Sequence, residues 1–179
     1  MSTTVLDTTA LSLLLLPANA NQDHAAVSFA RERIETWVQT RVQEGGTVII
    51  PAPVLSEFLV RAGDGINDLL KEIRTSRWFQ VVGFDSAAAV ELAIRTTRAL
   101  AAGDKREGLK ADWTKIKFDR QIVAIAIVAG ATEILSDDQD VHSIGERWGI
   151  KVIRAGDLPL PKALQKPSLL EGIPDLEMD

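Results

Sequence analysis

Apolar positions along the chain follow two different patterns. Five short runs rich in β-branched and other apolar residues lie at 4–6, 47–50, 79–82, 133–135 and 151–153. Between them, apolar residues recur at helical spacing in longer, more polar segments, which is typical of amphipathic helices. Strands separated by helices favour a parallel sheet covered on both faces. The pattern therefore predicts an α/β protein with a central parallel sheet of about five strands.

Turn and cap residues mark where several of these elements begin and end. Pro53 suits the first turn of a helix, and Gly63 suits its end. Asp85 is a good residue to cap the helix that follows it. Residues 103–114 show little apolar periodicity and are predicted to form a loop.

The length of the chain predicts one main domain with a peripheral tail. We assign residues 1–158 to that domain. Residues 159–179 contain four of the seven prolines and are predicted to be an extended arm or tail.

Acidic residues stand where buried strands end or helices begin. They are Asp7, Glu57, Asp119 and the pair Asp137 and Asp138. Carboxylates beside a core are costly unless something compensates them, and carboxylates that gather raise one another's pKa unless a cation neutralises them. A hard divalent ion, Mg²⁺ or Mn²⁺, suits a site built only from oxygen.

Each acidic position also has a structural interpretation. Asp7 can cap the next helix, and Glu57 can be a surface residue at the edge of an apolar stripe. Asp119 is predicted in the first turn of a strongly apolar helix, where the helix dipole favours a carboxylate. The aspartate pair can open another helix. A calcium-binding EF-hand fits poorly, because the sixth position counted from Asp138 is Ser143 and not glycine.

Composition excludes several classes of protein. The chain has no cysteine, which excludes disulfides and thiol chemistry, and two histidines. No apolar run approaches the roughly 18 residues of a membrane span. Residues 11–20 look like a secretory leader, but no lysine or arginine precedes Arg31 and Asp7 interrupts the apolar stretch. We therefore expect no export and a cytoplasmic location.

Basic residues are concentrated in one part of an acidic chain. The net charge is −5, which argues against indiscriminate nucleic-acid binding. Eight of the twenty basic residues nevertheless lie between Arg95 and Arg120 and run into Asp119. This basic stripe can be a solvated helix face and loop, or it can grip phosphates.

Four motifs, taken in order, resemble one known family. They are Val-Leu-Asp-Thr-Thr (5–9), Pro-Ala-Pro-Val-Leu-Ser-Glu (51–57), Phe-Asp-Arg-Gln-Ile-Val-Ala-Ile-Ala (118–126) and Leu-Ser-Asp-Asp-Gln-Asp (135–140). The combination is similar to the PIN-domain nucleases, in particular the VapC-type toxins of bacterial toxin–antitoxin pairs. The resemblance implies a three-layer α/β/α sandwich and Mg²⁺- or Mn²⁺-dependent cleavage of single-stranded or structured RNA.

The resemblance also implies roles for individual residues. Asp7, Glu57, Asp119 and Asp138 correspond to the catalytic metal ligands, with Asp137 as an additional candidate. Polar side chains that support these ligands are expected at Thr8, Thr9 and Ser136. The basic stripe supplies the expected RNA-binding residues, which are Lys105, Arg106, Lys110, Lys115, Lys117 and Arg120. The family often has Asn or Ser where Thr9 stands and an aromatic residue where Val141 stands.

The same resemblance predicts an antitoxin partner and a homodimer. Trp37 lies beside the apolar stripe of the helix predicted at 25–42, where it can belong to a dimer interface or to the core. Two other functions stay open. One is a non-catalytic PIN-like module that binds RNA or protein. The other is a phosphotransferase of the haloacid-dehalogenase type, which would leave Glu57 without a role and expects a second aspartate where Thr9 stands.

Overall fold

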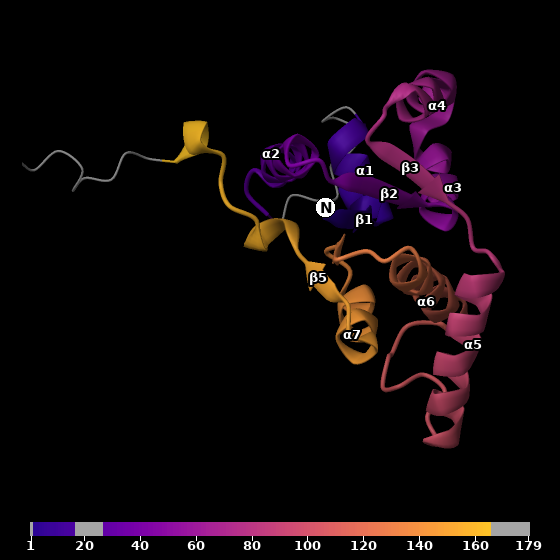
Figure 1. Ribbon diagram of the computed structural model, residues 1–179. Coiled ribbons are helices and arrows are strands. Elements are labelled where there is room, and N and C mark those ends of the chain that lie inside the picture. The colour runs from indigo at the N-terminus through magenta and orange to yellow at the C-terminus, as the bar shows by residue number, and fades with distance from the viewer. Residues whose placement is uncertain (1, 17–26, 166–179) are drawn as a thin grey trace, which may run out of the picture.

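A parallel five-stranded sheet with the order β3-β2-β1-β4-β5 lies at the centre of the structure (Figure 1). The structure is a computed structural model, and it describes residues 2–16 and 27–165. The strands are β1 (Thr3–Leu6), β2 (Thr47–Pro51), β3 (Phe79–Val82), β4 (Glu133–Leu135) and β5 (Lys151–Ile153). All five predicted strands are confirmed, and their bounds differ from the predicted ones by one residue at most.

Helices cover both faces of this sheet (Figure 1). One layer contains α1 (Thr8–Leu15), α2 (Ala30–Gln43), α3 (Ala52–Ala62) and α4 (Ile66–Thr75). The other layer contains α5 (Ser86–Ala101), α6 (Trp113–Val128) and α7 (Gln139–Trp148). Short 3₁₀ turns lie at Gly63–Gly65, Ala155–Asp157 and Lys162–Leu164. The predicted three-layer α/β/α sandwich is therefore confirmed.

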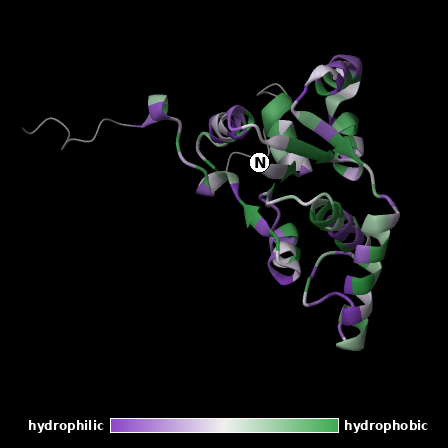
Figure 2. Cartoon of the chain, viewed as in Figure 1, coloured by the Kyte–Doolittle hydropathy of each residue, from purple (hydrophilic) through white to green (hydrophobic). Residues whose placement is uncertain are grey.

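The core explains why the central strands read as continuous apolar runs. Val5, Leu6, Ile50 and Ile134 are fully buried, because helices cover the sheet on both sides. Figure 2 shows the resulting concentration of hydrophobic residues in the strands, with hydrophilic residues on the outer helices. The second half of helix α6 is deeply enclosed, since every residue from 122 to 126 is buried. A helical segment that is apolar on all sides belongs inside the molecule.

The predicted caps occur in the structure. Asp85 precedes α5 and accepts a hydrogen bond from the backbone N–H of Ala88 at 2.9 Å. Pro53 lies in the first turn of α3, and Gly63 ends that helix with a positive φ of 54°. Gly145 permits a close approach of α7 to β5, because a Cβ atom there would lie 2.3 Å from the Val152 side chain.

Helix α2 begins later than predicted, at Ala30, and the predicted residues 25 and 26 lie outside the described part of the chain. Trp37 is partly buried and packs against the core, and the Arg41 guanidinium lies 4.9 Å from the centre of its ring. The core interpretation of this tryptophan therefore agrees with its surroundings.

Two further predictions concern residues that the structure does not describe. The leader-like cleavage motif at 18–20 and the prolines at 167 and 174 lie outside residues 2–16 and 27–165. The division into a domain at 1–158 and a tail at 159–179 thus stays a prediction. Within the described ranges, no helix has both the length and the apolar character that crossing a membrane requires.

Strand topology determines where a ligand can bind. β1 lies between β2 and β4, and the chain leaves β1 and β4 toward opposite faces of the sheet. In open α/β sheets, such a reversal opens a crevice beyond the carboxyl ends of the two strands. Leu6 and Leu135 are partners in the register. Asp7 and the 136–138 turn, which follow these strands, therefore emerge side by side.

Candidate active site

Asp7 is held at the carboxyl end of β1 by its role as the cap of α1. Its Oδ1 accepts a hydrogen bond from the backbone N–H of Ala10 at 2.8 Å, and its Oδ2 accepts one from the Ser136 hydroxyl. The residue is 5% exposed. Burial raises the pKa of Asp7 to about 7, against the lowering effect of these two hydrogen bonds. The cap and ligand interpretations are therefore compatible with each other.

The turn after β4 directs its two aspartates to different places. Asp138 caps α7 and accepts hydrogen bonds from the backbone N–H groups of Asp140 and Val141. Asp137 instead accepts one from the backbone N–H of Ala155 at 2.9 Å. Asp137 thus ties the turn to the segment after β5, and it is absent from the wall of the cleft described below.

Asp119 lies deeper in its helix than the sequence analysis predicts. Helix α6 begins at Trp113, so Asp119 is in the second turn and not the first. The segment from 113 to 116 extends the helix upstream, with Trp113 and Ile116 separated by the polar Thr114 and Lys115. Asp119 is 6% exposed. Burial raises the pKa of Asp119 to about 6, although the Lys115 ammonium lowers it.

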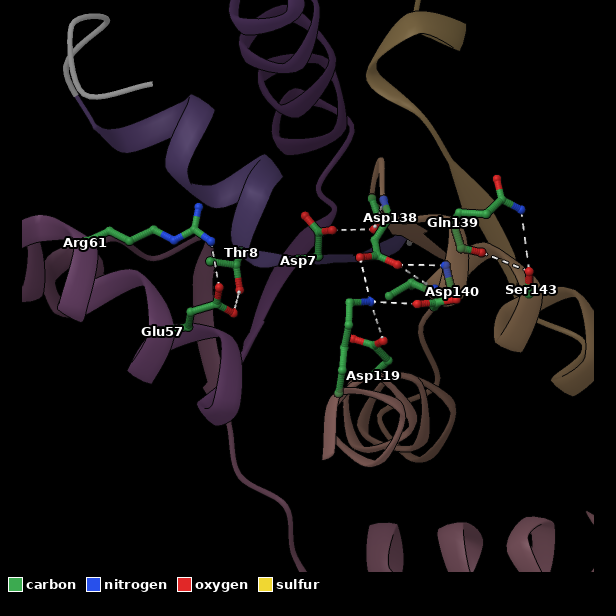
Figure 3. A network of polar contacts seen from close by, with 12 residues as sticks. Asp7, Thr8, Glu57, Arg61, Asp119, Asp138, Gln139, Asp140 and Ser143 are labelled. Carbon is green, nitrogen blue, oxygen red and sulfur yellow. Dashed lines mark hydrogen bonds and ion pairs between the residues drawn. The ribbon is translucent and has the colours of Figure 1, made fainter. Parts of the chain in front are cut away.

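Three carboxylates converge where α6 meets the start of α7 (Figure 3). One oxygen from each of Asp119, Asp138 and Asp140 lies within 4.8 Å of the others. We call these three residues the acidic cluster. Sequence reasoning missed Asp140, although it stands two residues after Asp138, in the first turn of the helix that Asp138 caps. That spacing, at a helix start beside a predicted ligand, is the signal that could have identified it.

Lys115 neutralises part of the acidic cluster from within. Its Nζ lies 2.9 Å from an Oδ2 atom of each of the three aspartates. Partial burial lowers the pKa of Lys115. Its hydrogen bonds with the three aspartates raise the pKa and together outweigh burial, so the pKa lies well above its ordinary value. Burial likewise raises the pKa of Asp138, but Lys115 and the capped N–H groups leave it below its usual range. The cluster therefore holds a cation in this structure.

Glu57 approaches from the other helical layer. It projects from α3, and its Oε2 accepts a hydrogen bond from the Thr8 hydroxyl at 2.8 Å. Its Oε1 forms an ion pair with Arg61 at 2.7 Å, one turn further along the same helix (Figure 3). Glu57 is not part of the acidic cluster. In this structure its charge is balanced by Arg61.

All four predicted acids line one cleft at the carboxyl edge of the sheet. The cleft has a volume of about 490 Å³. Its lining residues are Asp7, Thr8, Thr9, Glu57, Arg61, Thr114, Lys115, Phe118, Asp119, Ile122, Asp138 and Val141. The supporting residues Thr8 and Ser136 bond to Glu57 and Asp7 respectively, while Thr9 lies in the cleft wall. Only Asp119 and Asp138 of the four meet closely enough to share an ion here, together with Asp140.

Two members of the predicted RNA-binding set occupy unexpected positions. Lys115 is inside the cleft and bound to the acidic cluster, so in this state it is not a phosphate contact. Arg120 is 1% exposed and pairs with Glu107, so it is unavailable to RNA. The expectation for Arg120 is therefore wrong. Arg120 faces inward because it lies on the buried face of α6, together with Ile116 and Val123.

The other basic residues of the set lie at the surface. Lys105, Arg106, Lys110 and Lys117 are exposed. The Lys105 ammonium lies 3.9 Å from the centre of the Trp113 ring, which fixes it near the start of α6. Asp104 orders the same loop by accepting hydrogen bonds from the backbone N–H groups of Arg106 and Gly108.

The sheet order, the helical layers and the acidic edge define an α/β/α sandwich of the PIN type. Neither models of known protein families nor curated proteins match the chain. Among solved structures, this chain is similar to a chain of VapBC2 from Rickettsia felis, whose crystal structure was determined bound to a DNA fragment from the VapBC2 promoter. The TM-score is 0.54 at 12% identity, covering 85% of this chain and 98% of that chain. The predicted resemblance to this group is thereby confirmed for the fold.

Proposed function

We propose that this protein is a metal-dependent endoribonuclease that acts as the toxin of a toxin–antitoxin pair. The observation that carries the proposal is the cleft at the carboxyl edge of the sheet, which Asp7, Glu57, Asp119 and Asp138 all line. Placing four carboxylates around one cleft lowers the stability of a fold, unless the site has to hold positive charge. The fold likeness to VapBC2 supports the class of protein.

The donor set fits a hard divalent cation. The cleft offers carboxylate and hydroxyl oxygens, and the described residues of the chain contain no cysteine. Mg²⁺ and Mn²⁺ prefer such oxygen ligands. Lys115 already sits among three carboxylates, which indicates that this position favours a cation. We propose that Asp119, Asp138 and Asp140 hold the ion and that Asp7 and Glu57 complete the site.

The ion would supply an activated water and charge neutralisation for phosphodiester hydrolysis. The protein's own residues contribute positioning. Ser136 and Ala10 fix the Asp7 carboxylate, and Thr8 fixes that of Glu57. These hydrogen bonds hold the two carboxylates at the cleft wall before any substrate arrives.

The RNA backbone would follow the exposed basic residues beside the cleft. Four exposed members of the predicted RNA-binding set are Lys105, Arg106, Lys110 and Lys117, and we call them the accessible part of the basic stripe. Such contacts neutralise phosphates without reading sequence. We further propose a cytoplasmic location, an antitoxin partner and a homodimer, which agree with a toxin of this fold.

A nuclease assay on mixed RNA tests the proposal. We expect cleavage with Mg²⁺ or Mn²⁺ and none with EDTA, leaving 5′-phosphate and 3′-hydroxyl ends. Asp119→Asn should remove the activity, whereas Asp64→Asn, an exposed aspartate in the Gly63–Gly65 turn, should keep it. Cleavage that persists in EDTA, or in Asp119→Asn, would refute the metal-dependent mechanism.

One observation favours a second candidate, a non-catalytic PIN-like module that binds RNA or protein. The acidic cluster is already partly neutralised by Lys115. A module of that kind would bind RNA equally well in Mg²⁺ and in EDTA and would leave the RNA intact. The same assay, followed by a binding measurement, distinguishes the two functions.

A further inference from the structure

Lys115 occupies the place in the cleft where a metal ion would be held. Its Nζ lies at hydrogen-bond distance, 2.9 Å, from one oxygen of each member of the acidic cluster. The lysine is in the first turn of α6, and Asp119 is one turn further along. Asp138 and Asp140 come from the start of α7. A single ammonium group therefore bridges two helices through three carboxylates.

The charges of this arrangement do not balance. Three carboxylates in their ionised form carry three negative charges, and one ammonium group compensates only one of them. A divalent ion would compensate more and would use the same oxygen atoms. Two cations cannot share these oxygens at close range, because they would repel each other. Occupation by lysine and occupation by metal therefore exclude each other.

The side chain of Lys115 can leave without disturbing the fold. It is 43% exposed, and its flexible four-carbon stem lies in the wall of an open cleft. Its backbone is held in α6, so a displaced ammonium group would remain at the cleft wall. There it could contact a substrate phosphate, whereas the other basic residues of the predicted RNA-binding set do not line the cleft.

We propose that Lys115 is a built-in counter-cation that holds the acidic cluster together without metal and is displaced by the divalent ion. This inference rests on the proposed function and specifies how that site is loaded. Without metal, Lys115 suppresses the repulsion among the three aspartates. With metal, it is released into the cleft. The lysine thus sets the metal concentration at which the site fills.

Direct measurement of Mn²⁺ binding tests this competition. Free Mn²⁺ is followed by electron paramagnetic resonance in titrations of the wild type, Lys115→Met and Lys117→Met. Lys117 is the matched control, because it is exposed on the same helix two residues away. Removing a competing cation should tighten Mn²⁺ binding about tenfold, the usual size of coupling between two sites. Lys117→Met should bind as the wild type does.

Thermal melting in EDTA provides a second readout. Lys115→Met should melt about 3 °C below the wild type, because three carboxylates lose their counter-cation. Saturating Mn²⁺ should remove that difference, since the ion replaces the ammonium group. Circular dichroism verifies that the variant is folded before both measurements. A variant that melts as the wild type does in EDTA contradicts the stabilising role.

Lysine-selective acetylation, read by mass spectrometry, reports the position of Lys115 in the unmodified protein. Saturating Mg²⁺ should raise the labelling rate of Lys115 about tenfold, while that of Lys117 stays constant, because displacement frees the ammonium group from three partners. Unchanged labelling of Lys115 in a protein that demonstrably binds the ion overturns the proposal.

Failure of this inference can be separated from failure of the proposed function. Equal Mn²⁺ affinity of Lys115→Met and the wild type, in a protein that cleaves RNA, rejects the lysine competition and retains the nuclease. Absence of Mn²⁺ binding in both proteins rejects the metal site and, with it, the competition. If Lys115→Met binds Mn²⁺ and the wild type does not, the lysine competes so strongly that it keeps the ion out of the wild-type site.

Discussion

At the scale of single residues, the site contains carboxylates at buried positions, where ionisation is energetically unfavourable. Asp7 and Asp119 are both nearly buried, and burial raises the pKa of each, to about 7 and about 6. Asp7 accepts hydrogen bonds from the Ala10 backbone N–H and the Ser136 hydroxyl, and neither donor carries a charge. Such perturbed carboxyl groups in a cleft are typical of functional sites. They also make metal binding and stability depend on pH.

Asp7→Asn should stabilise the metal-free protein at pH 8 and abolish cleavage. The folded pKa of about 7 lies above the unfolded value of 3.8, so the stability that Asp7 contributes is lost as pH rises through about 7. A neutral amide avoids this loss. Its oxygen can accept the hydrogen bond from Ala10, while its NH2 group would donate to the Ser136 hydroxyl in the reverse direction. We expect about 2 kcal/mol more unfolding free energy at pH 8 and little change at pH 4. Urea unfolding in EDTA measures both, and equal gains at the two pH values would contradict the account.

Metal affinity should fall as pH decreases through the range from about 7 to about 6. Asp7 and Asp119 must lose their protons before they can ligate an ion, and their pKa values lie in that range. Mn²⁺ titrations at pH 5.5, 6.5 and 7.5 should show the affinity rising at each step. A pH-independent affinity over this interval would indicate that neither carboxyl group contributes to the site.

At the scale of elements, the strands and caps could be predicted, whereas α6 could not be predicted completely. The five strands stand out because buried parallel strands are continuous apolar runs. The start of α6 at Trp113 is hidden, because Thr114, Lys115 and Lys117 interrupt the apolar residues before Asp119. The ion pairs of Lys115 also escaped prediction. One pair joins Lys115 to Asp119 within α6, but the other two join α6 to the start of α7, and pairing between separate helices leaves no sequence periodicity.

The loop before α6 is attached to that helix by a buried ion pair. The Arg120 guanidinium bonds to Glu107 at 2.5 Å and to the backbone carbonyl of Lys105 at 3.0 Å. Glu107→Ala should cost about 3 kcal/mol, because it leaves a buried arginine without its carboxylate. Urea unfolding checks this value. Glu146→Ala, at an exposed position of α7, is the control and should change stability by less than about 0.5 kcal/mol.

At the scale of the whole molecule, two layers of helices bring charges of both signs to one edge of the sheet. Glu57 and Arg61 come from α3, and the acidic cluster with Lys115 comes from α6 and α7. The strand-end placement of the four acids and their order in the sequence predicted that they meet at one edge of the sheet, and all four line one cleft there. Only Asp119 and Asp138 of the four belong to the acidic cluster, whereas Glu57 pairs with Arg61. This division was not predictable, because it depends on how the layers pack.

The accessible part of the basic stripe should govern RNA affinity without affecting the metal site. Replacing Lys105, Arg106 and Lys110 by alanine should weaken binding similarly for different RNA sequences and flatten its salt dependence. Fluorescence anisotropy at low and moderate salt measures both effects. Mn²⁺ affinity serves as the internal control and should not change. Unchanged RNA affinity at both salt concentrations would show that this surface is only solvated.

The homodimer is tested separately by analytical ultracentrifugation. We expect a dimer at micromolar concentration, in keeping with the proposed toxin role. A monomer throughout that range would remove the dimer from the account and leave the cleft and its chemistry untouched.

The central claim is that the acidic cleft cleaves RNA with the help of a divalent ion. The most direct test compares the wild type with Asp138→Asn on single-stranded RNA in Mn²⁺, Mg²⁺ and EDTA. Asp138 is chosen because it belongs both to the cleft and to the acidic cluster. We expect metal-dependent cleavage by the wild type and at least about a hundredfold slower cleavage by folded Asp138→Asn. Intact RNA with the wild type in both metals, or equal rates for the two proteins, would contradict the central claim.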